Sequence, residues 1–175
     1  MKKRKIAVLV GSRNDIAGGQ CMAGLQLLQR AVAGEQIEVV GVYIGSIHRN
    51  TEWVLALLKE LAAREVDVAI VGAGWANHIT GTSDAYLRYQ ISNTRTVVVG
   101  VAFNDYESDE RTQAAIGSIK HVPGTQVVFD NYVGSDGFER ACKFAIAGKL
   151  PTITAVAPRA TATLTLDEAI AIVNP

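Results

Sequence analysis

The chain is poor in cysteine and in aromatic residues, and it has no long apolar run. Its 175 residues include two cysteines, Cys21 and Cys142, and aromatic side chains make up 6%. The cysteines lie far apart on apolar faces of expected helices, so we expect buried thiols with neither a disulfide nor a metal site. No apolar run approaches the roughly 20 residues that span a membrane, so we expect no membrane association.

Formal charges balance, with 17 lysines and arginines against 17 aspartates and glutamates. Four of the basic residues are consecutive at Lys2–Lys5, and the others form no basic stripe of the kind that binds nucleic-acid phosphates. The apolar run that follows, Ile6–Val10, is too short for the hydrophobic part of a signal peptide. We therefore expect a cytoplasmic protein that binds no nucleic acid.

Length and apolar content suggest one domain with an appended arm. We place the domain at residues 1–150 and the arm at residues 151–175. The arm is rich in Thr and Ala, and Thr165 with Glu168 forms a capping-box signature before a short apolar helix. Apolar residues make up 49% of the chain, an excess that we interpret as subunit interface. We expect the arm to pack on a neighbouring copy.

Apolar strands alternate with helical patterns throughout the first 150 residues. Strands are expected at residues 6–10, 37–44, 66–71, 96–103 and 126–129. Helices are expected from Cys21 to a stop at Gly34, from a cap at Asn50 or Thr51 with Trp53 in the core, at 83–92, at 112–119, and from a cap at Ser135 to Gly148. This alternation predicts an α/β fold, a flavodoxin-like three-layer sandwich with a five-stranded parallel sheet.

Polar runs directly follow the first three strands, at Gly11–Asp15, Ser46–Arg49 and Gly72–His78. Loops at the carboxyl ends of parallel strands converge on one crevice, so these runs should meet. The crevice would hold hydroxyls, a carboxylate, an imidazole, a guanidinium and glycine backbone. These groups could bind a small phosphorylated metabolite and transfer a proton.

The first run offers groups that bind a sugar phosphate. Ser12 and Asn14 can donate to phosphate oxygens, and Asp15 can accept from ribose hydroxyls. The alternative interpretation is a capping turn, with Asn14 or Asp15 as the helix cap. Taken alone, a run of five residues favours the capping turn.

The second run contains an adjacent imidazole and guanidinium just after Ser46. The forked donor of Arg49 suits phosphate, and a neutral His48 can take and return a proton. A His-Arg pair is also typical of solvated surface. Its position at the carboxyl end of a strand favours a functional interpretation.

The third run brings backbone close to the crevice. Gly72, Ala73 and Gly74 allow a close approach, although a tight turn needed for packing is an equal alternative. Trp75 could form a wall of the crevice or stack on a planar ring. For His78 we favour a structural role over proton transfer. The acidic run at 105–110 is interpreted as a solvated loop, with a lid over the site as the alternative.

In order and spacing these runs resemble the PurE family, the carboxyaminoimidazole ribonucleotide mutases of purine biosynthesis. The family motif Gly-Ser-x-Ser-Asp is matched by Gly11–Asp15, and Ser-Ala-His-Arg is matched by Ser46–Arg49. The motif Gly-Ala-Gly-Gly-Ala-Ala-His-Leu-Pro-Gly is matched in part by Gly72–Gly81. The likeness extends over about residues 4–130.

The resemblance implies a homo-octamer that uses no metal or organic cofactor. It implies that Ser12, Asp15 and Arg49 meet the phosphate and ribose of a ribonucleotide and that His48 is the general acid and base. The reaction would move a carboxyl group from the exocyclic amine to a ring carbon of aminoimidazole ribonucleotide, with carbon dioxide released and recaptured. The related carboxylase takes free carbon dioxide instead.

The chain departs from the family motifs where the base and carboxyl group would bind. Asn14 replaces a serine, Trp75 replaces a glycine, and Thr80 replaces a proline, while the polar run 104–110 replaces small residues. Three alternatives therefore stay open: a PurE-like enzyme acting on a different ribonucleotide, a non-catalytic nucleotide-binding module, and a flavodoxin-like electron carrier. The last lacks a convincing aromatic pair to flank a flavin.

Overall fold

A computed structural model describes residues 2–173. Its sheet contains four parallel strands in the order β2-β1-β3-β4. The strands are β1 (Arg4–Val10), β2 (Ile37–Ile44), β3 (Val68–Ala73) and β4 (Val97–Ala102). This order and the parallel pairing confirm the predicted flavodoxin-like class.

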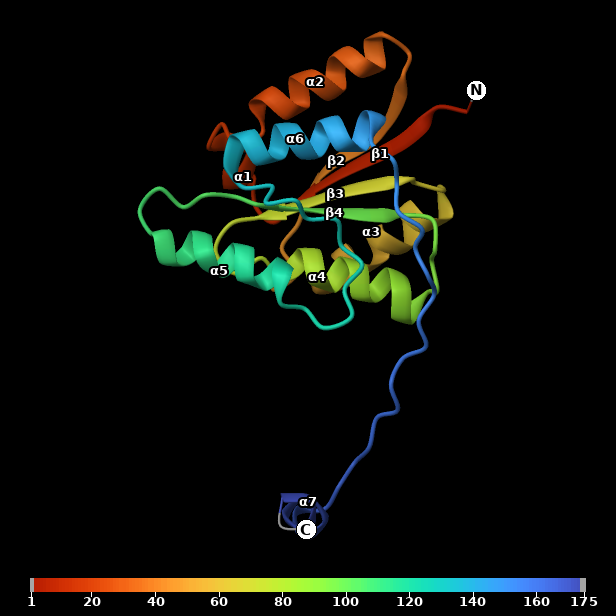
Figure 1. Cartoon of the computed structure of the whole chain (residues 1–175), viewed down its shortest axis with the longest axis vertical. Coiled ribbons are helices and arrows are strands. Elements are labelled where there is room, and N and C mark those ends of the chain that lie inside the picture. The colour runs from red at the N-terminus through yellow and green to blue at the C-terminus, as the bar shows by residue number, and fades with distance from the viewer. Residues whose placement is uncertain (1, 174–175) are drawn as a thin grey trace.

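Helices cover both faces of the sheet (Figure 1). On one face α2 (Met22–Ala33) and α6 (Gly134–Ala147) lie side by side, and on the other lie α3 (Thr51–Ala63), α4 (His78–Ala85) and α5 (Asp109–Lys120). The central strand β1 is buried on both sides because its apolar side chains alternate between the two layers. The α2 and α6 layer receives Ile6, Val8 and Val10, and the α3 and α4 layer receives Ala7 and Leu9.

The fifth strand, predicted at 126–129, is not a regular strand. The segment lies along the free edge of β4 in parallel, but it pairs only as isolated bridges, Val99 with Val128 and Ala102 with Val133. Between the two bridges Asn131 adopts a left-handed backbone with φ of 46°. A residue in that conformation interrupts the extended ladder, which leaves a four-stranded sheet with an irregular fifth edge.

A buried ion pair anchors this irregular edge. The Arg88 Nε atom lies 3.0 Å from Asp84 Oδ1, and both side chains are almost fully buried. The other carboxylate oxygen of Asp84 accepts the backbone N–H of Gln126 at 2.8 Å. The guanidinium also donates to the carbonyl oxygens of Asn93 and Thr96. Nearly every polar atom of the pair is satisfied, as a buried charge requires.

The helix predicted at 83–92 begins five residues earlier, at His78. The Asn77 side chain accepts the backbone N–H of Thr80 at 3.2 Å and so caps the helix at this point. After Ala85 the chain continues as a π-helical turn, η1 (Tyr86–Gln90). The side-chain cap therefore sets the start of α4.

The helix predicted at 112–119 likewise begins earlier, at Asp109. The Ser108 hydroxyl accepts the backbone N–H of Arg111 at 3.3 Å and caps α5. The polar run at 104–110 therefore includes the cap and first residues of a helix. It is not solely a solvated loop.

Two single-residue interpretations were wrong. Trp53 is 45% exposed, because the face of α3 that meets the sheet carries Val54, Leu57, Leu58 and Leu61 instead. Ser135 does not cap α6, since the helix begins at Gly134 with Val133 in the cap position. The predicted helix stops at Gly34 and Gly148 are both confirmed. Cys21 and Cys142 are buried, as expected.

The C-terminal arm leaves the body after a short contact. Gln126 and Thr154 exchange two hydrogen bonds, of 2.9 and 3.0 Å, and Ile153 is buried beside them. Farther along, α7 (Leu166–Val173) stands away from the sheet and buries none of its residues (Figure 1). The predicted capping box is present, with reciprocal bonds between Thr165 and Glu168. Within residues 2–173 no helix has the length and apolarity needed to cross a membrane.

Candidate active site

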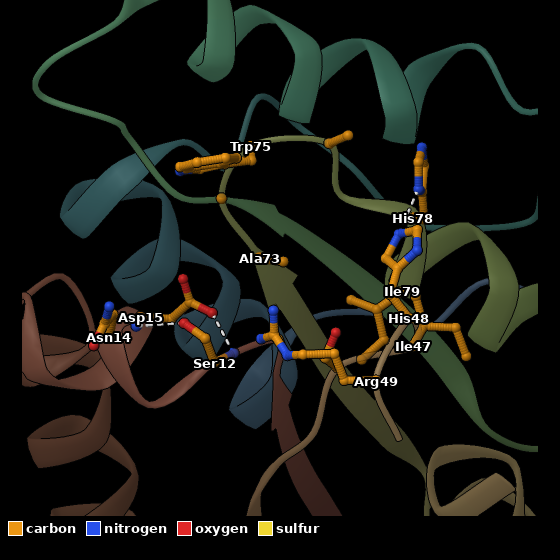
Figure 2. Close-up of a pocket in the computed structure, with 14 residues that line it drawn as sticks. Ser12, Asn14, Asp15, Ile47, His48, Arg49, Ala73, Trp75, His78 and Ile79 are labelled. Carbon is orange, nitrogen blue, oxygen red and sulfur yellow. Dashed lines mark hydrogen bonds between the residues drawn. The ribbon is translucent and has the colours of Figure 1, made fainter. Parts of the chain in front are cut away.

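A hollow of about 450 Å³ opens at the carboxyl ends of β1, β2 and β3 (Figure 2). Its volume lies within the usual range of small-molecule sites. All three predicted loops contribute to it, and it is open on one side, where the imidazoles, the guanidinium and the indole are exposed. The lining residues are Gly11, Ser12, Asn14, Asp15, Ser46, Ile47, His48, Arg49, Ala73, Gly74, Trp75, Ala76, His78 and Ile79.

Backbone hydrogen bonds continue from the sheet into the roots of these loops. Gly11 donates to the Gly72 carbonyl at 3.0 Å, and Gly45 donates to the Val10 carbonyl at 2.9 Å. A Cβ at Gly11 would lie 2.9 Å from the Ala73 Cβ, so the close approach of the first and third loops requires glycine there. The loops are thereby held at fixed positions relative to one another.

The first loop is organised by a capping box between Ser12 and Asp15. Ser12 caps α1 (Arg13–Ala17): its hydroxyl accepts the Asp15 N–H at 3.3 Å, and its own N–H donates to Asp15 Oδ2 at 2.7 Å. The capping interpretation was therefore right in kind, although the cap is Ser12 and not Asn14 or Asp15. The Ser12 hydroxyl proton stays available as a donor, because its oxygen acts here as the acceptor.

Burial raises the pKa of the Asp15 carboxyl above its ordinary value, while hydrogen bonds from Ser12 and from the Gly74 backbone oppose that shift. The carboxylate therefore joins the first and third loops from inside the hollow. It is also positioned to accept hydrogen bonds from a ligand hydroxyl, since a carboxylate has two oxygens with several lone pairs.

The second loop is a compact turn that presents His48 and Arg49. Asn50 donates to the Ser46 carbonyl at 2.7 Å, and the Asn50 side chain accepts the Ser46 N–H at 3.2 Å. The Arg49 guanidinium extends across the hollow toward Ser12 and Asp15 (Figure 2). No ion pair or hydrogen bond to this guanidinium occurs within residues 2–173. Its donors are directed into the hollow, where a guanidinium can bind an anion.

His48 and His78 are hydrogen-bonded to each other, although they come from different loops. The Nε2 atom of His48 lies 2.9 Å from Nδ1 of His78. Both rings line the hollow, on the side opposite Ser12 and Asp15 (Figure 2). A pair of imidazoles in contact can pass one proton between them and store it during a reaction.

His78 owes its position to a residue that sequence analysis missed. Asn77 is fully buried, and its amide donates to the Val101 carbonyl at 2.8 Å while its oxygen accepts from Thr80. Asn77 thereby fixes the start of α4 against β4. An asparagine just before a histidine, followed three residues later by threonine, was the available signal, because asparagine is a preferred helix cap.

Trp75 lines the rim of the hollow and is covered from outside by Arg111. The Cζ atom of Arg111 lies 4.2 Å from the centroid of the indole. Arg111 also forms an ion pair with Asp105, at 3.1 Å. Sequence analysis identified Trp75 but not Arg111, which lies 36 positions farther along the chain and was not singled out.

Sequence analysis gave ten candidate residues for the crevice besides His48. Nine of them line the hollow together with His48: Ser12, Asn14, Asp15, Ser46, Arg49, Ala73, Gly74, Trp75 and His78. The exception is Gly72, which is buried beneath the hollow on β3, where a Cβ would lie 2.9 Å from the Phe103 ring. The missing side chain at Gly72 leaves room for the Phe103 ring. Gly11, Ile47, Ala76 and Ile79 line the hollow as well and were not among the proposed binding residues.

A family model described as AIR carboxylase matches residues 5–147. The chain belongs to the AIR carboxylase family. The match includes all three loops of the hollow and ends within α6, so the C-terminal arm lies outside it. No curated protein matches the chain.

Two solved structures from Treponema denticola share the fold. A substituted form of PurE2 aligns with a TM-score of 0.60 and 16% identity, covering 83% of this chain and 87% of its own. PurE from the same organism aligns with a TM-score of 0.56 and 18% identity, covering 82% and 87%. These likenesses identify the family's fold in this chain.

Proposed function

We propose that this chain carries out the PurE type of carboxyl transfer on aminoimidazole ribonucleotide, with His48 as the group that moves the proton. Family membership supports a mutase or carboxylase of this kind in purine biosynthesis. The observation that carries the proposal is the meeting of the His48–His78 pair and Arg49 with the Ser12–Asp15 loop in one hollow.

Each part of the nucleotide has a matching group in the hollow. The phosphate binds between the Arg49 guanidinium and the Ser12 hydroxyl, which are both donors. The ribose hydroxyls donate to Asp15, which lies on the same loop as Ser12. Ile47 and Ile79 supply apolar surface next to the histidines. This assignment leaves the base near the third loop and the imidazole pair.

The proposed reaction needs one proton transfer at carbon. The ring carbon of aminoimidazole ribonucleotide attacks carbon dioxide, and a carbon–carbon bond forms. His48 then takes the proton from that carbon, which restores the aromatic ring. In the mutase the carbon dioxide comes from the N-carboxylated nucleotide: its carbon–nitrogen bond breaks first and protonated His48 gives a proton to that nitrogen, and the proton later taken from carbon restores protonated His48. In the carboxylase the proton taken from carbon is released to water. No electrons are gained or lost overall.

The deciding experiment compares His48→Ala with His121→Ala. His121 is a surface histidine outside the hollow and serves as the matched control. We expect His48→Ala to abolish product formation while nucleotide binding, measured by calorimetry, persists. Turnover retained in His48→Ala would refute the assigned role.

Supplying the carbon in two forms separates mutase from carboxylase. The wild-type protein is given aminoimidazole ribonucleotide with bicarbonate, or the N-carboxylated nucleotide, and product is followed. Faster turnover of the N-carboxylated form identifies the mutase, and faster turnover with bicarbonate identifies the carboxylase. Binding without turnover in either case would favour the non-catalytic nucleotide-binding module.

A further inference from the structure

Trp75 is exposed and adopts a backbone conformation that a bulky residue rarely takes. Its φ is 55°, in the left-handed region, and 61% of its surface is exposed at the rim of the hollow. Glycine would adopt this conformation without strain. A large apolar ring kept in such a place, beside a candidate active site, points to a role for the ring itself.

One face of the indole is already occupied. Arg111 covers it from α5 and does not line the hollow, whereas Trp75 does. In Figure 2 the ring lies between the hollow, with Asp15 on that side, and the ribbon of α5 on the other. The face opposite Arg111 is therefore the face that a ligand in the hollow would meet.

Arg111 is itself held in place. Its Nη1 atom lies 3.1 Å from Asp105 Oδ2, and the Asp105 side chain is only 10% exposed. The backbone N–H of Asp105 donates to the Thr112 hydroxyl at 2.9 Å, and the neighbouring Asn104 exchanges two hydrogen bonds of 2.9 Å with Gln20. Because this chain of contacts fixes the guanidinium, it also limits the motion of the ring beneath it.

We propose that Trp75 is the surface on which the planar base of the bound nucleotide stacks, with Arg111 as the positioning residue that holds the indole. The proposal rests on the proposed nucleotide site. The Asp15 Oδ1 atom lies 3.9 Å from the position that a Cβ on Gly74 would take, next to the indole, so a ribose held by Asp15 places its base toward Trp75. Flat heteroaromatic rings gain from stacking, and a bare sugar phosphate does not.

The test compares ribose 5-phosphate, which has no base, with aminoimidazole ribonucleotide by calorimetry. Trp75→Ala should reduce the preference for the base-bearing ligand by roughly 5- to 150-fold, the range expected for the loss of one stacking contact. The dissociation constant of ribose 5-phosphate should stay unchanged, and Trp75→Phe should keep most of the preference. Trp53→Phe leaves Trp75 as the single tryptophan, whose fluorescence should change with the nucleotide only.

The positioning role is tested on the same preference. Arg111→Gln should reduce it, and Arg111→Lys should retain more of it; the melting temperature of each variant is measured alongside, to separate lost positioning of the ring from lost folding stability. Arg140→Gln is the matched control, because the Arg140 guanidinium lies 5.2 Å from the Tyr132 ring centroid and neither residue lines the hollow. An effect of Arg140→Gln equal to that of Arg111→Gln would overturn the positioning role.

The outcomes separate the two proposals. An unchanged preference in Trp75→Ala, or equal weakening of both ligands, would overturn stacking while leaving the sugar-phosphate site intact. A wild-type protein that binds ribose 5-phosphate but shows no preference for the base would overturn it as well. A wild-type protein that binds neither ligand would overturn the proposed function and the stacking proposal together.

Discussion

The Nε2 atom of His48 and the Nδ1 atom of His78 lie 2.9 Å apart, which joins the loops that follow β2 and β3. The ring planes are inclined at 53°, with centroids 5.1 Å apart. In a hydrogen bond one of these nitrogens carries the proton and the other accepts it. The tautomer of His48 is therefore coupled to that of His78, and in the proposed reaction a proton taken from the substrate would enter a shared pair.

His78 should support catalysis through this hydrogen bond. We expect His78→Ala to lower kcat by less than the ~10²–10⁴-fold loss expected for His48→Ala. His78→Gln should retain more activity, because its amide can still bond to His48. Steady-state rates across neutral pH check this, since loss of the partner should change the pH profile of His78→Ala. Equal activity of wild type and His78→Ala would assign His78 a purely structural role.

Arg49 should contribute to phosphate binding and not to the chemical step. Removing a charge-assisted contact in Arg49→Ala should weaken ribose 5-phosphate binding by about 1.5–3 kcal/mol. Arg13→Ala is the control: Arg13 follows Ser12 on the first loop but does not line the hollow. Calorimetry of both variants distinguishes a direct contact from a general loss of positive charge. A general loss would weaken ribose 5-phosphate binding equally in Arg49→Ala and Arg13→Ala.

The Asp15 carboxylate should lower folding stability at neutral pH and strengthen nucleotide binding. Because burial raises its pKa in the folded state, ionisation of this carboxyl costs stability as the pH rises through and above its ordinary value of 3.8. Asp15→Asn should therefore be more stable than wild type at neutral pH, and the difference should disappear as the pH falls below that value. Urea unfolding at several pH values measures this. Nucleotide binding should weaken in the same variant, because the amide is a poorer acceptor for ribose hydroxyls.

Asp84 should be among the most important residues for stability. Asp84→Ala leaves the buried Arg88 charge without its partner and removes the acceptor for the Gln126 N–H, so we expect a loss of about 3–5 kcal/mol in urea unfolding. Asp136→Ala is the matched control, because Asp136 also pairs with an arginine four residues later but is exposed. That substitution should cost less than about 1 kcal/mol.

The apolar face of α7 should be an interface between copies of this chain. Leu166 and Ile170 lie one helical turn apart and are 76% and 50% exposed. Replacing both with glutamate should lower the mass measured by light scattering, because charge opposes burial of that face. Asp167→Asn, on the same helix, should leave the mass unchanged. An unchanged assembly in the double variant would contradict the predicted role of the arm.

Much of the fold was predictable because the burial of a central strand is visible in a short stretch of sequence. A strand buried on both faces must be a continuous apolar run, and Ile6–Val10 was found for that reason. The fifth strand was not predictable as an irregular edge, because the left-handed turn at Asn131 leaves the apolar pattern of 126–129 intact. Trp53 was misassigned because it lies at the border of the apolar face of α3. Helical spacing alone does not show whether a residue at that border is buried or exposed.

The site was predictable to the extent that it lies at strand ends. Parallel topology brings Ser12, His48 and Gly74 to one edge whatever the side chains do. Contacts from more distant segments were not predictable. Arg111 covers Trp75 only because α5 begins at Asp109 and turns its first residues toward the third loop. Pairing of His48 with His78 likewise depends on the buried amide of Asn77.

The backbone bonds from Gly11 to Gly72 and from Gly45 to Val10 have a consequence for inactivation. The hydrogen bonds between the strands continue into the first residues of these loops. The loops of the candidate site are therefore held directly by the sheet. Ligand affinity should be lost on heating at the temperature where the whole domain melts, not before. A substitution that destabilises the sheet should therefore also weaken ligand binding in the hollow.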